Sequence, residues 1–212
     1  MGGGLLVATL MGSGVLYDLP ISNHGARVRF LLYKKGLEAT VPIVSPMELG
    51  GLGSDEYKAL NPQGKMPLLV EDDGLAVWET DAICRHILDK HSDASGPSFF
   101  PSTLSARTRS EMFCRLHDAY IGPIQGCLYK LAEKSPFGSF GSRAEAIRSL
   151  RAQLAVAEDL ADVSGPYLTG DEISLADATL FPTVSHPTHA TMLDSQTSEQ
   201  PHAGPPNART AY

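Results

Sequence analysis

The chain has 212 residues, of which 42% are hydrophobic, so it is long enough to bury one large core or two small ones. Charged residues make up 19% and the formal net charge is -7, which argues against a nucleic-acid-binding protein, because such a protein needs a basic surface to neutralise phosphates. No apolar run reaches the roughly 18 residues that a membrane-spanning helix requires. Three cysteines without a C-x-x-C pair favour a reducing, cytoplasmic location, with organelle targeting left open.

The first part of the sequence alternates between strand-like and helix-like segments. Residues 1–14 are rich in glycine and contain none of the basic residues that a secretory or transit signal needs, so we predict a disordered extension. The elements predicted after it, in chain order, are a strand at 15–18, a helix at 22–36, a strand at 40–44, a helix at 54–60, a hairpin of strands at 67–70 and 75–78, and a helix at 80–91. This βαβαββα order predicts a small mixed sheet covered by helices, an α/β domain over 15–92.

The second part of the sequence predicts helices only. A segment rich in serine, glycine and proline, 93–103, is typical of a linker. Apolar side chains then recur at helical spacing, first at Met112, Phe113, Leu116 and Tyr120, and later at Ile147, Leu150, Leu154, Ala157 and Ala161. Gly122-Pro123 predicts a kink or break in the first of these helices. We therefore predict an all-α domain over 104–184, and a disordered tail over 185–212, where prolines stand among polar side chains.

Ser22 is the first candidate for chemistry, because it lies between a predicted strand and the start of a predicted helix. The N–H groups and the dipole at a helix start stabilise an anion. A serine hydroxyl at that place can donate a hydrogen bond to a bound thiolate and so lower the pKa of the thiol. A purely structural reading stays open as well, in which Ser22 or Asn23 only caps the helix.

Two further motifs are consistent with a peptide-like ligand. Pro67 opens a strand directly after a turn, which is a good site for a cis peptide bond, and such a bond turns the N–H and C=O of Met66 outward to pair with a ligand as an added strand. At the start of the next helix, Thr80 can bind a carboxylate while Glu79 or Asp81 pairs with an ammonium group. Each motif alone also fits an ordinary strand edge or a capped helix.

In this order on a βαβαββα frame, the helix-start serine, the cis-proline motif and the acid–hydroxyl pair resemble the glutathione site of the glutathione transferase superfamily. The resemblance covers about 15–184, and the segment 165–177 is similar to the signature of that family's second domain. There Ser174 and Asp177 form an S-x-x-D variant of the capping box, which fixes the start of a core helix and is structural rather than catalytic. The resemblance implies a thioredoxin-like glutathione-binding domain followed by an all-α C-terminal domain.

The resemblance also implies roles for individual residues. In the serine-type classes of the family, a serine near the start of the first helix stabilises the glutathione thiolate, and Ser22 matches that serine by position. The family pairs the cysteinyl backbone of glutathione with the residue before the cis-proline, and it holds the γ-glutamyl end with an acid and a hydroxyl. The glutathione-binding residues implied in this way are Lys65, Met66, Pro67, Glu79 and Thr80.

The electrophile pocket of the family normally lies between the two domains, which implies Tyr120 and Gln125 as lining residues. Two features depart from the family pattern. No clear basic residue stands between Met47 and Asp55 to meet the glycyl carboxylate. The family also continues past Val184 into further apolar helices, where this sequence turns polar, so we expect the C-terminal helices to be missing and the second domain to be truncated.

The expected function is conjugation of the glutathione thiolate to small electrophiles, with glutathione as a co-substrate and with no metal or other cofactor. Alternatives on the same fold are a glutathione-dependent isomerase or dehalogenase, and a non-catalytic glutathione-transferase-like binding module. A glutaredoxin-like oxidoreductase would need a cysteine in place of Ser22. The resemblance further implies a homodimer, and we expect no nucleic-acid or membrane partner.

Overall fold

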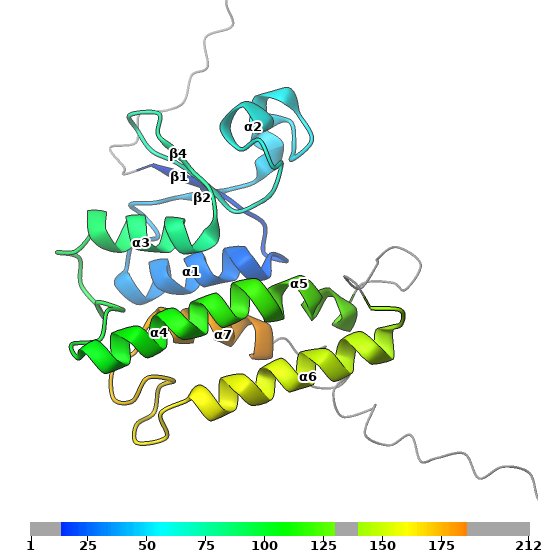
Figure 1. The fold of residues 1–212 in the computed structure, drawn as a ribbon. Coiled ribbons are helices and arrows are strands. Elements are labelled where there is room, and N and C mark those ends of the chain that lie inside the picture. Colours follow the sequence, from blue (N-terminus) through cyan, green and yellow to red (C-terminus); the bar gives the residue numbers. More distant parts are fainter. Residues whose placement is uncertain (1–13, 130–139, 186–212) are drawn as a thin grey trace, which may run out of the picture.

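The computed structural model describes residues 14–129 and 140–185, which form a small mixed sheet with its helices, followed by a helical part (Figure 1). The extension predicted at 1–14 and the tail predicted at 185–212 fall, apart from Gly14 and Ser185, outside the described residues. The expectation that further C-terminal helices are missing falls there too. Within the described ranges, no helix is both long enough and apolar enough to cross a membrane.

Four short strands form the sheet in the order β2-β1-β3-β4. The strands are β1 (Val15–Tyr17), β2 (Ile43–Val44), β3 (Leu68–Val70) and β4 (Ala76–Val77). β1 runs parallel to β2 and antiparallel to β3, and β3 and β4 form the predicted hairpin. β2 is shorter than the predicted 40–44, because the N–H of Val41 still bonds to the carbonyl of Leu37 in the turn before it.

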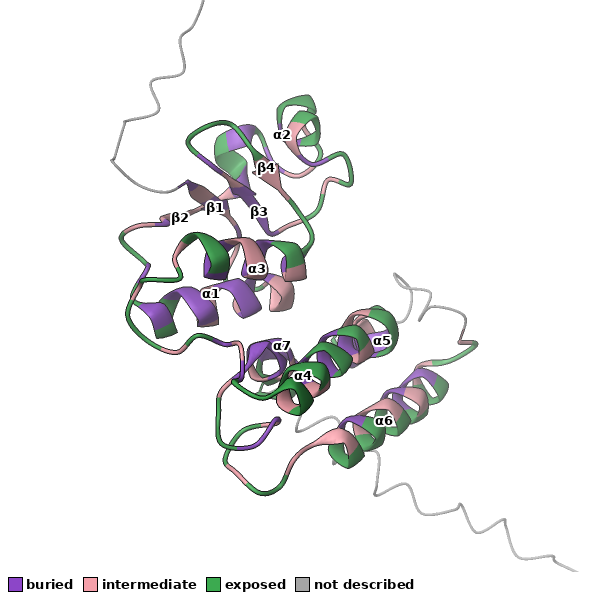
Figure 2. Cartoon of the chain, turned by 60° about the vertical axis from the view of Figure 1, so that its left-hand side comes forward, coloured by how far each residue is buried: buried purple, intermediate pink, exposed green. Residues whose placement is uncertain are grey.

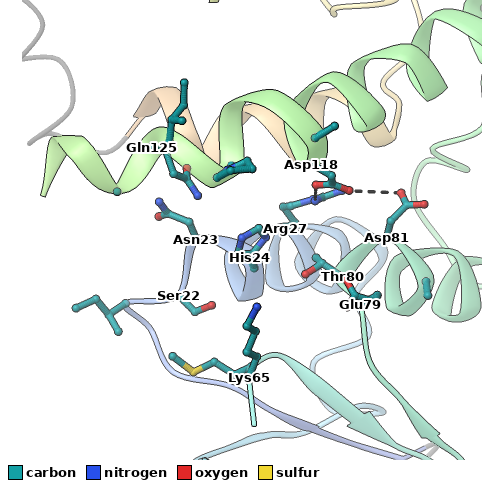
Figure 3. Close-up of a pocket in the computed structure, with 18 of the residues that line it drawn as sticks. Ser22, Asn23, His24, Arg27, Lys65, Glu79, Thr80, Asp81, Asp118 and Gln125 are labelled. Carbon is teal, nitrogen blue, oxygen red and sulfur yellow. Dashed lines mark hydrogen bonds and ion pairs between the residues drawn. The ribbon is translucent and has the colours of Figure 1, made fainter. Parts of the chain in front are cut away.

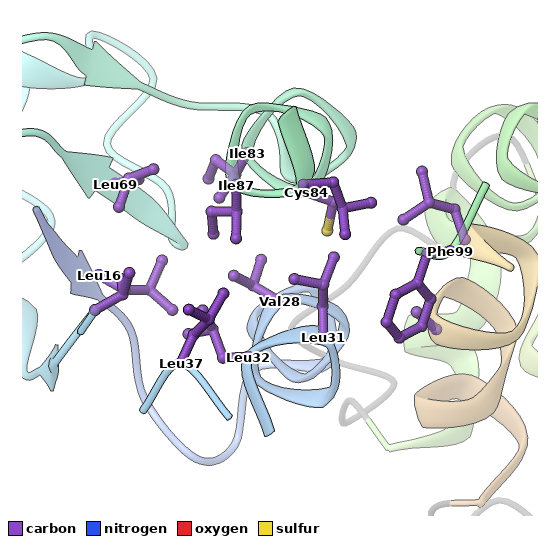
Figure 4. Close-up of a cluster of buried hydrophobic side chains, with 14 of the residues drawn as sticks. Leu16, Val28, Leu31, Leu32, Leu37, Leu69, Ile83, Cys84, Ile87 and Phe99 are labelled. Atoms are coloured by element: carbon purple, nitrogen blue, oxygen red, sulfur yellow. The ribbon is translucent and has the colours of Figure 1, made fainter. Parts of the chain in front are cut away.

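Three helices belong to this sheet, and they confirm the predicted βαβαββα order. They are α1 (Asn23–Lys35), α2 (Asp55–Leu60) and α3 (Thr80–Lys90). α1 and α3 cover one face of the sheet and α2 lies on the other (Figures 1 and 2). Strand residues alternate between the faces, so Leu16 and Leu69 pack against α1 and α3 (Figure 4), whereas Leu68 packs against Tyr57 of α2.

Both predicted ends of α1 are confirmed. Ser22 is the N-cap, and Gly36 takes the left-handed conformation at the C-cap, where φ is 64° and its N–H bonds to the carbonyls of Leu32 and Tyr33. Between these ends α1 buries Val28, Leu31 and Leu32 in the main core.

The second part is helical, as predicted. It consists of α4 (Leu104–Leu116), a π-helical turn (His117–Ile121), α5 (Gly122–Gln125), a 3-10 turn (Gly126–Leu128), α6 (Arg143–Leu160) and α7 (Leu175–Ser185). α7 lies against both α1 and α4, and its Leu175 and Ala178 share one core with Leu31 of α1. The two parts of the molecule therefore share a core at the helix that begins after Ser22.

The apolar face predicted for the first helix of this part is only partly correct. Phe113 is buried, but the side chains of Met112 and Tyr120 are 51% and 59% exposed. Met112 and Phe113 are neighbours in sequence and point about 100° apart on a helix, so they cannot both face one core. The π-helical turn before Gly122 then adds a residue to the helical repeat and turns Tyr120 toward solvent. Gly122-Pro123 does not break the helix, because the chain stays helical from Leu104 to Leu128; the regular α-helix is interrupted just before this pair, by the π-helical turn.

Candidate functional site

An open cavity of about 1200 Å³ lies where the starts of α1 and α3 and the loop before β3 meet α4 and α5 (Figure 3). Of the residues that the sequence predicts for a site, those that line the cavity are Ser22, Lys65, Met66, Glu79, Thr80 and Gln125. Pro67 is buried and is not part of the lining. Tyr120 is not part of it either, because the π-helical turn exposes its side chain on the surface.

The hydroxyl of Ser22 accepts one hydrogen bond, and its O–H can still donate another. Its oxygen accepts a hydrogen bond of 2.9 Å from the N–H of Gly25, which caps α1. A hydroxyl has one donor and two acceptor positions, so this bond leaves the O–H available for a ligand in the cavity. Capping and ligand binding by Ser22 are therefore compatible, and the structural and the chemical readings do not exclude each other.

The loop before β3 presents peptide groups to the same cavity. The Met66–Pro67 bond is cis, as the motif predicts. The carbonyl of Lys65 is fixed by two donors, the hydroxyl of Tyr57 at 2.7 Å and the side-chain amide of Asn61 at 2.8 Å. Within the described residues, by contrast, the N–H and C=O of Met66 take part in no backbone hydrogen bond, so both remain free to pair with a peptide-like ligand.

The start of α3 is the third wall of the cavity and it carries backbone strain. Glu79 has a φ of 72°, in the left-handed region that residues other than glycine adopt at a cost of about 1–3 kcal/mol. Its side chain does not cap the helix; instead it accepts a bond of 3.1 Å from Gln63. The first N–H groups of α3, at Thr80 and Asp81, consequently face the cavity without a side-chain cap, where they can bind a carboxylate.

His24, which the sequence analysis did not select, also lines the cavity. Burial and, to a lesser extent, the neighbouring His117 and Arg27 together lower the pKa of His24 to about 4, so the imidazole is neutral near pH 7. Its ring lies edge-on to that of His117, with 6.0 Å between the ring centroids. The position next to Ser22 and Asn23 is the only signal in the sequence that could have pointed to this residue.

An ion network centred on a buried arginine lines the cavity and joins the two parts of the chain. Arg27 of α1 is 1% exposed; it donates to Asp118 at 2.6 Å and lies 3.8 Å from Asp81 (Figure 3). Burial alone would raise the pKa of Asp118, but the hydrogen bond from His117 and the charge of Arg27 hold it at about 2. No local sequence pattern predicts this network, since Arg27 and Asp118 are 91 positions apart.

The S-x-x-D segment lies outside the cavity and makes one of the two hydrogen bonds of a capping box, from the N–H of Ser174 to the acid; the hydroxyl of Ser174 accepts from the N–H of Ala176 instead of that of Asp177. The carboxylate of Asp177 accepts from the N–H of Ser174 at 2.7 Å and from its hydroxyl at 3.0 Å. The other carboxylate oxygen accepts from the N–H of Leu168 at 2.9 Å. One side chain thus fixes both the start of α7 and the loop that precedes it.

Comparison with known proteins finds relatives that are similar to this chain in sequence and in fold. Residues 16–97 match the family model described as glutathione S-transferase, N-terminal domain. Glutathione S-transferase 3 of Zea mays is 30% identical over 166 residues, which cover 77% of this chain and 73% of the relative. Maleylacetoacetate isomerase of Rattus norvegicus is 27% identical over 177 residues, 82% of this chain and 78% of the relative. The crystal structure of poplar glutathione transferase F1 has the same fold, with a TM-score of 0.65 at 20% identity over 89% of this chain and 94% of that one.

Proposed function

The chain belongs to the glutathione S-transferase family, and on that premise we propose that it binds glutathione in this cavity and transfers the glutathione thiolate to a small electrophile. The observation that supports the proposal is that hydrogen-bonding groups suited to the γ-glutamyl end, the cysteinyl backbone and the thiol of glutathione line one cavity. Those groups are the uncapped start of α3, the free peptide groups of Met66 and the hydroxyl of Ser22.

The γ-glutamyl end of glutathione belongs at the start of α3. Its carboxylate meets the N–H groups of Thr80 and Asp81 and the hydroxyl of Thr80, which stabilise a negative charge, and its ammonium group meets the carboxylate of Glu79. The cysteinyl residue then pairs with Met66 as an added strand, which brings its sulfur toward Ser22. The glycyl carboxylate lies near Lys65, whose ammonium group forms no ion pair with any described residue and lines the cavity.

The thiol must release its proton to solvent, to which the cavity is open, before its sulfur can attack. The O–H of Ser22 donates to the sulfur, and the helix start adds its positive dipole end, so both favour the thiolate over the thiol and lower the pKa of the ligand. The sulfur then attacks the electrophilic carbon, the new C–S bond forms, and the leaving group departs with the electron pair of the broken bond. Gln125 and the neighbouring residues of α5 form the wall from which the electrophile approaches.

Retention on immobilised glutathione, followed by conjugation of chlorodinitrobenzene, tests the proposal. We expect the protein to bind, to turn over, and to lose about a hundredfold in kcat/KM when Ser22→Ala removes the hydrogen bond to the thiolate. Ser142→Ala is the matched control, because Ser142 caps α6 in the same way, through the N–H of Glu145 at 3.2 Å, and does not line the cavity.

The outcomes separate the alternatives. Equal losses in the two serine variants mean that only helix capping matters, and they remove the thiolate role of Ser22. Binding without turnover favours the non-catalytic module. Failure to bind glutathione contradicts the whole site assignment. The implied homodimer stays a prediction that light scattering measures independently.

A second candidate function is glutathione-dependent isomerisation, favoured by the similarity to maleylacetoacetate isomerase of Rattus norvegicus. In such a reaction the thiolate adds to a cis double bond, the resulting single bond rotates, and elimination returns the thiolate and the trans product. Incubation with maleylacetoacetate distinguishes the two functions, because isomerisation consumes no glutathione whereas conjugation consumes one molecule per turnover.

A further inference from the structure

One side chain holds the backbone of the loop that leads to Ser22. The guanidinium of Arg29, on α1, donates to three carbonyl oxygens, those of Leu19 at 2.9 Å, Pro20 at 3.0 Å and Ser22 at 3.2 Å. It also forms an ion pair with the carboxylate of Asp18. The side chain of Arg29 is 14% exposed and that of Asp18 is fully buried, so the ion pair is largely shielded from water, whereas the contact with the carbonyl of Pro20 is exposed. The planar fork of an arginine suits such a multiple contact, and a lysine cannot reproduce it.

Asp18 connects this loop to the sheet and to the cap of α1. Its N–H donates to the carbonyl of Val44 in β2 at 2.9 Å, so the acid is fixed to the sheet. Its carboxylate lies directly against Gly25, where a Cβ would overlap it. The N–H of Gly25 is in turn the donor that the hydroxyl of Ser22 accepts. Acid, glycine and serine are therefore one contiguous unit under the first turn of α1.

The buried carboxylate is electrostatically unfavourable for a thiolate bound at Ser22. A negative charge close to a thiol disfavours its ionisation and raises its pKa. The ion pair with Arg29 cancels that charge, and the three carbonyl contacts fix the loop, so the same guanidinium removes an opposing charge and orients the hydroxyl.

We propose that Arg29 is a positioning residue for the thiolate chemistry, which fixes the Ser22 loop and neutralises Asp18 so that the glutathione thiol ionises. This inference rests on the proposed function. Arg29 touches no substrate; it acts through Ser22 and Asp18. Its effect is therefore on the pKa of the bound thiol more than on the affinity for glutathione.

The test measures the pKa of glutathione bound to the full chain, from the ultraviolet absorbance of its thiolate, together with the pH profile of kcat/KM. Arg29→Lys keeps the charge and loses the fork, and the double variant Asp18→Asn with Arg29→Gln removes both buried charges and the fork. We expect Arg29→Lys to raise the pKa of the bound thiol by about one unit, which lowers kcat/KM about tenfold on the acidic side of the profile, with less than a threefold change in glutathione Kd.

Arg109→Lys is the matched control, because Arg109 also donates to a backbone carbonyl, that of Leu160 at 3.2 Å, and lies near a carboxylate, 3.8 Å from Asp162. It should leave the pKa of the thiol unchanged. If the pKa of the bound thiol is as low in both Arg29 variants as in the wild-type chain, the inference is overturned while the proposed function stands. Weaker binding with an unchanged thiol pKa overturns it as well, since that is a structural effect only. A wild-type complex with an ordinary thiol pKa overturns both.

Discussion

Replacement of Gly25 by alanine tests the packing beneath the first turn of α1. In an unobstructed helix this change stabilises by about 1 kcal/mol, because alanine has the higher helix propensity. Here the added Cβ would overlap all three atoms of the Asp18 carboxylate, which is fully buried and fixed by Arg29. Overpacking of a rigid site costs about 1–3 kcal/mol, and displacing one partner of a buried ion pair adds a cost of about 3–5 kcal/mol when the pair breaks completely. With the gain in helix propensity subtracted, the net loss is about 3–7 kcal/mol when the ion pair breaks completely, and about 0–2 kcal/mol would remain if it survived. A Cβ that overlaps both carboxylate oxygens favours breakage, so we expect the larger loss.

Urea unfolding, followed by circular dichroism, measures this loss as a change in the free energy of unfolding. Gly53→Ala is the matched control, because a Cβ at Gly53 meets nothing within 4 Å. Its effect should stay within about 1 kcal/mol. In an Asp18→Ala background the cost of Gly25→Ala should shrink, which a double-mutant cycle detects as coupling. The reasoning is refuted if Gly25→Ala is as stable as the wild-type chain, or if its cost is the same with and without Asp18.

Two further predictions concern the capping box and the buried histidine. Asp177→Ala should lower the free energy of unfolding by about 2–4 kcal/mol, because it leaves the N–H groups of Leu168 and Ser174 without their acceptor; a loss below 1 kcal/mol in urea unfolding contradicts it. Burial, together with the neighbouring His117 and Arg27, lowers the pKa of His24 from 6.5 to about 4, so between these two pH values the unfolded chain binds a proton at His24 and the folded chain does not. The contribution of neutral His24 to the free energy of unfolding should therefore be fully present above about pH 6.5 and be lost, by up to about 3 kcal/mol, as the pH falls toward 4. Urea unfolding at several pH values should show a weaker pH dependence for His24→Gln; the same pH dependence in the two proteins contradicts the lowered pKa of His24.

The sequence predicts correctly those elements whose signals are local. The N-cap serine and the C-cap glycine delimit α1, the Asp-Gly turn predicts the hairpin, and the turn before Pro67 predicts the cis bond. Each signal works because it acts through hydrogen bonds or backbone preferences within a few residues. The order of the elements then follows from these boundaries, because each turn or cap residue marks where one element ends and the next begins.

The parts that the sequence does not predict depend on residues that meet only in the folded chain. Arg27 and Asp118 are far apart in sequence, and nothing in the local pattern of either residue indicates a partner. The exposed position of Tyr120 has a different cause, because the π-helical turn shifts the helical repeat by one residue and a periodicity count assumes a constant repeat. For this reason the wall of the cavity formed by α5, for which Tyr120 is wrongly predicted, is harder to predict from sequence than the wall around Met66.

The ion network also changes how the two parts of the chain relate to each other in the proposed mechanism. The sequence alone presents the glutathione site as a property of the first domain, with the second domain adding only an electrophile wall. In the structure, α1 is held on one side by Arg29, which ties the Ser22 loop to the sheet, and on the other by Arg27, whose partner Asp118 belongs to the second part. Breaking the Arg27–Asp118 pair would leave the buried Arg27 with only the more distant Asp81, at 3.8 Å, to balance its charge. In the proposed mechanism, α1, at whose start Ser22 lies, is thus held partly by a residue of the helical part, so the proposed thiolate site draws on both halves of the chain.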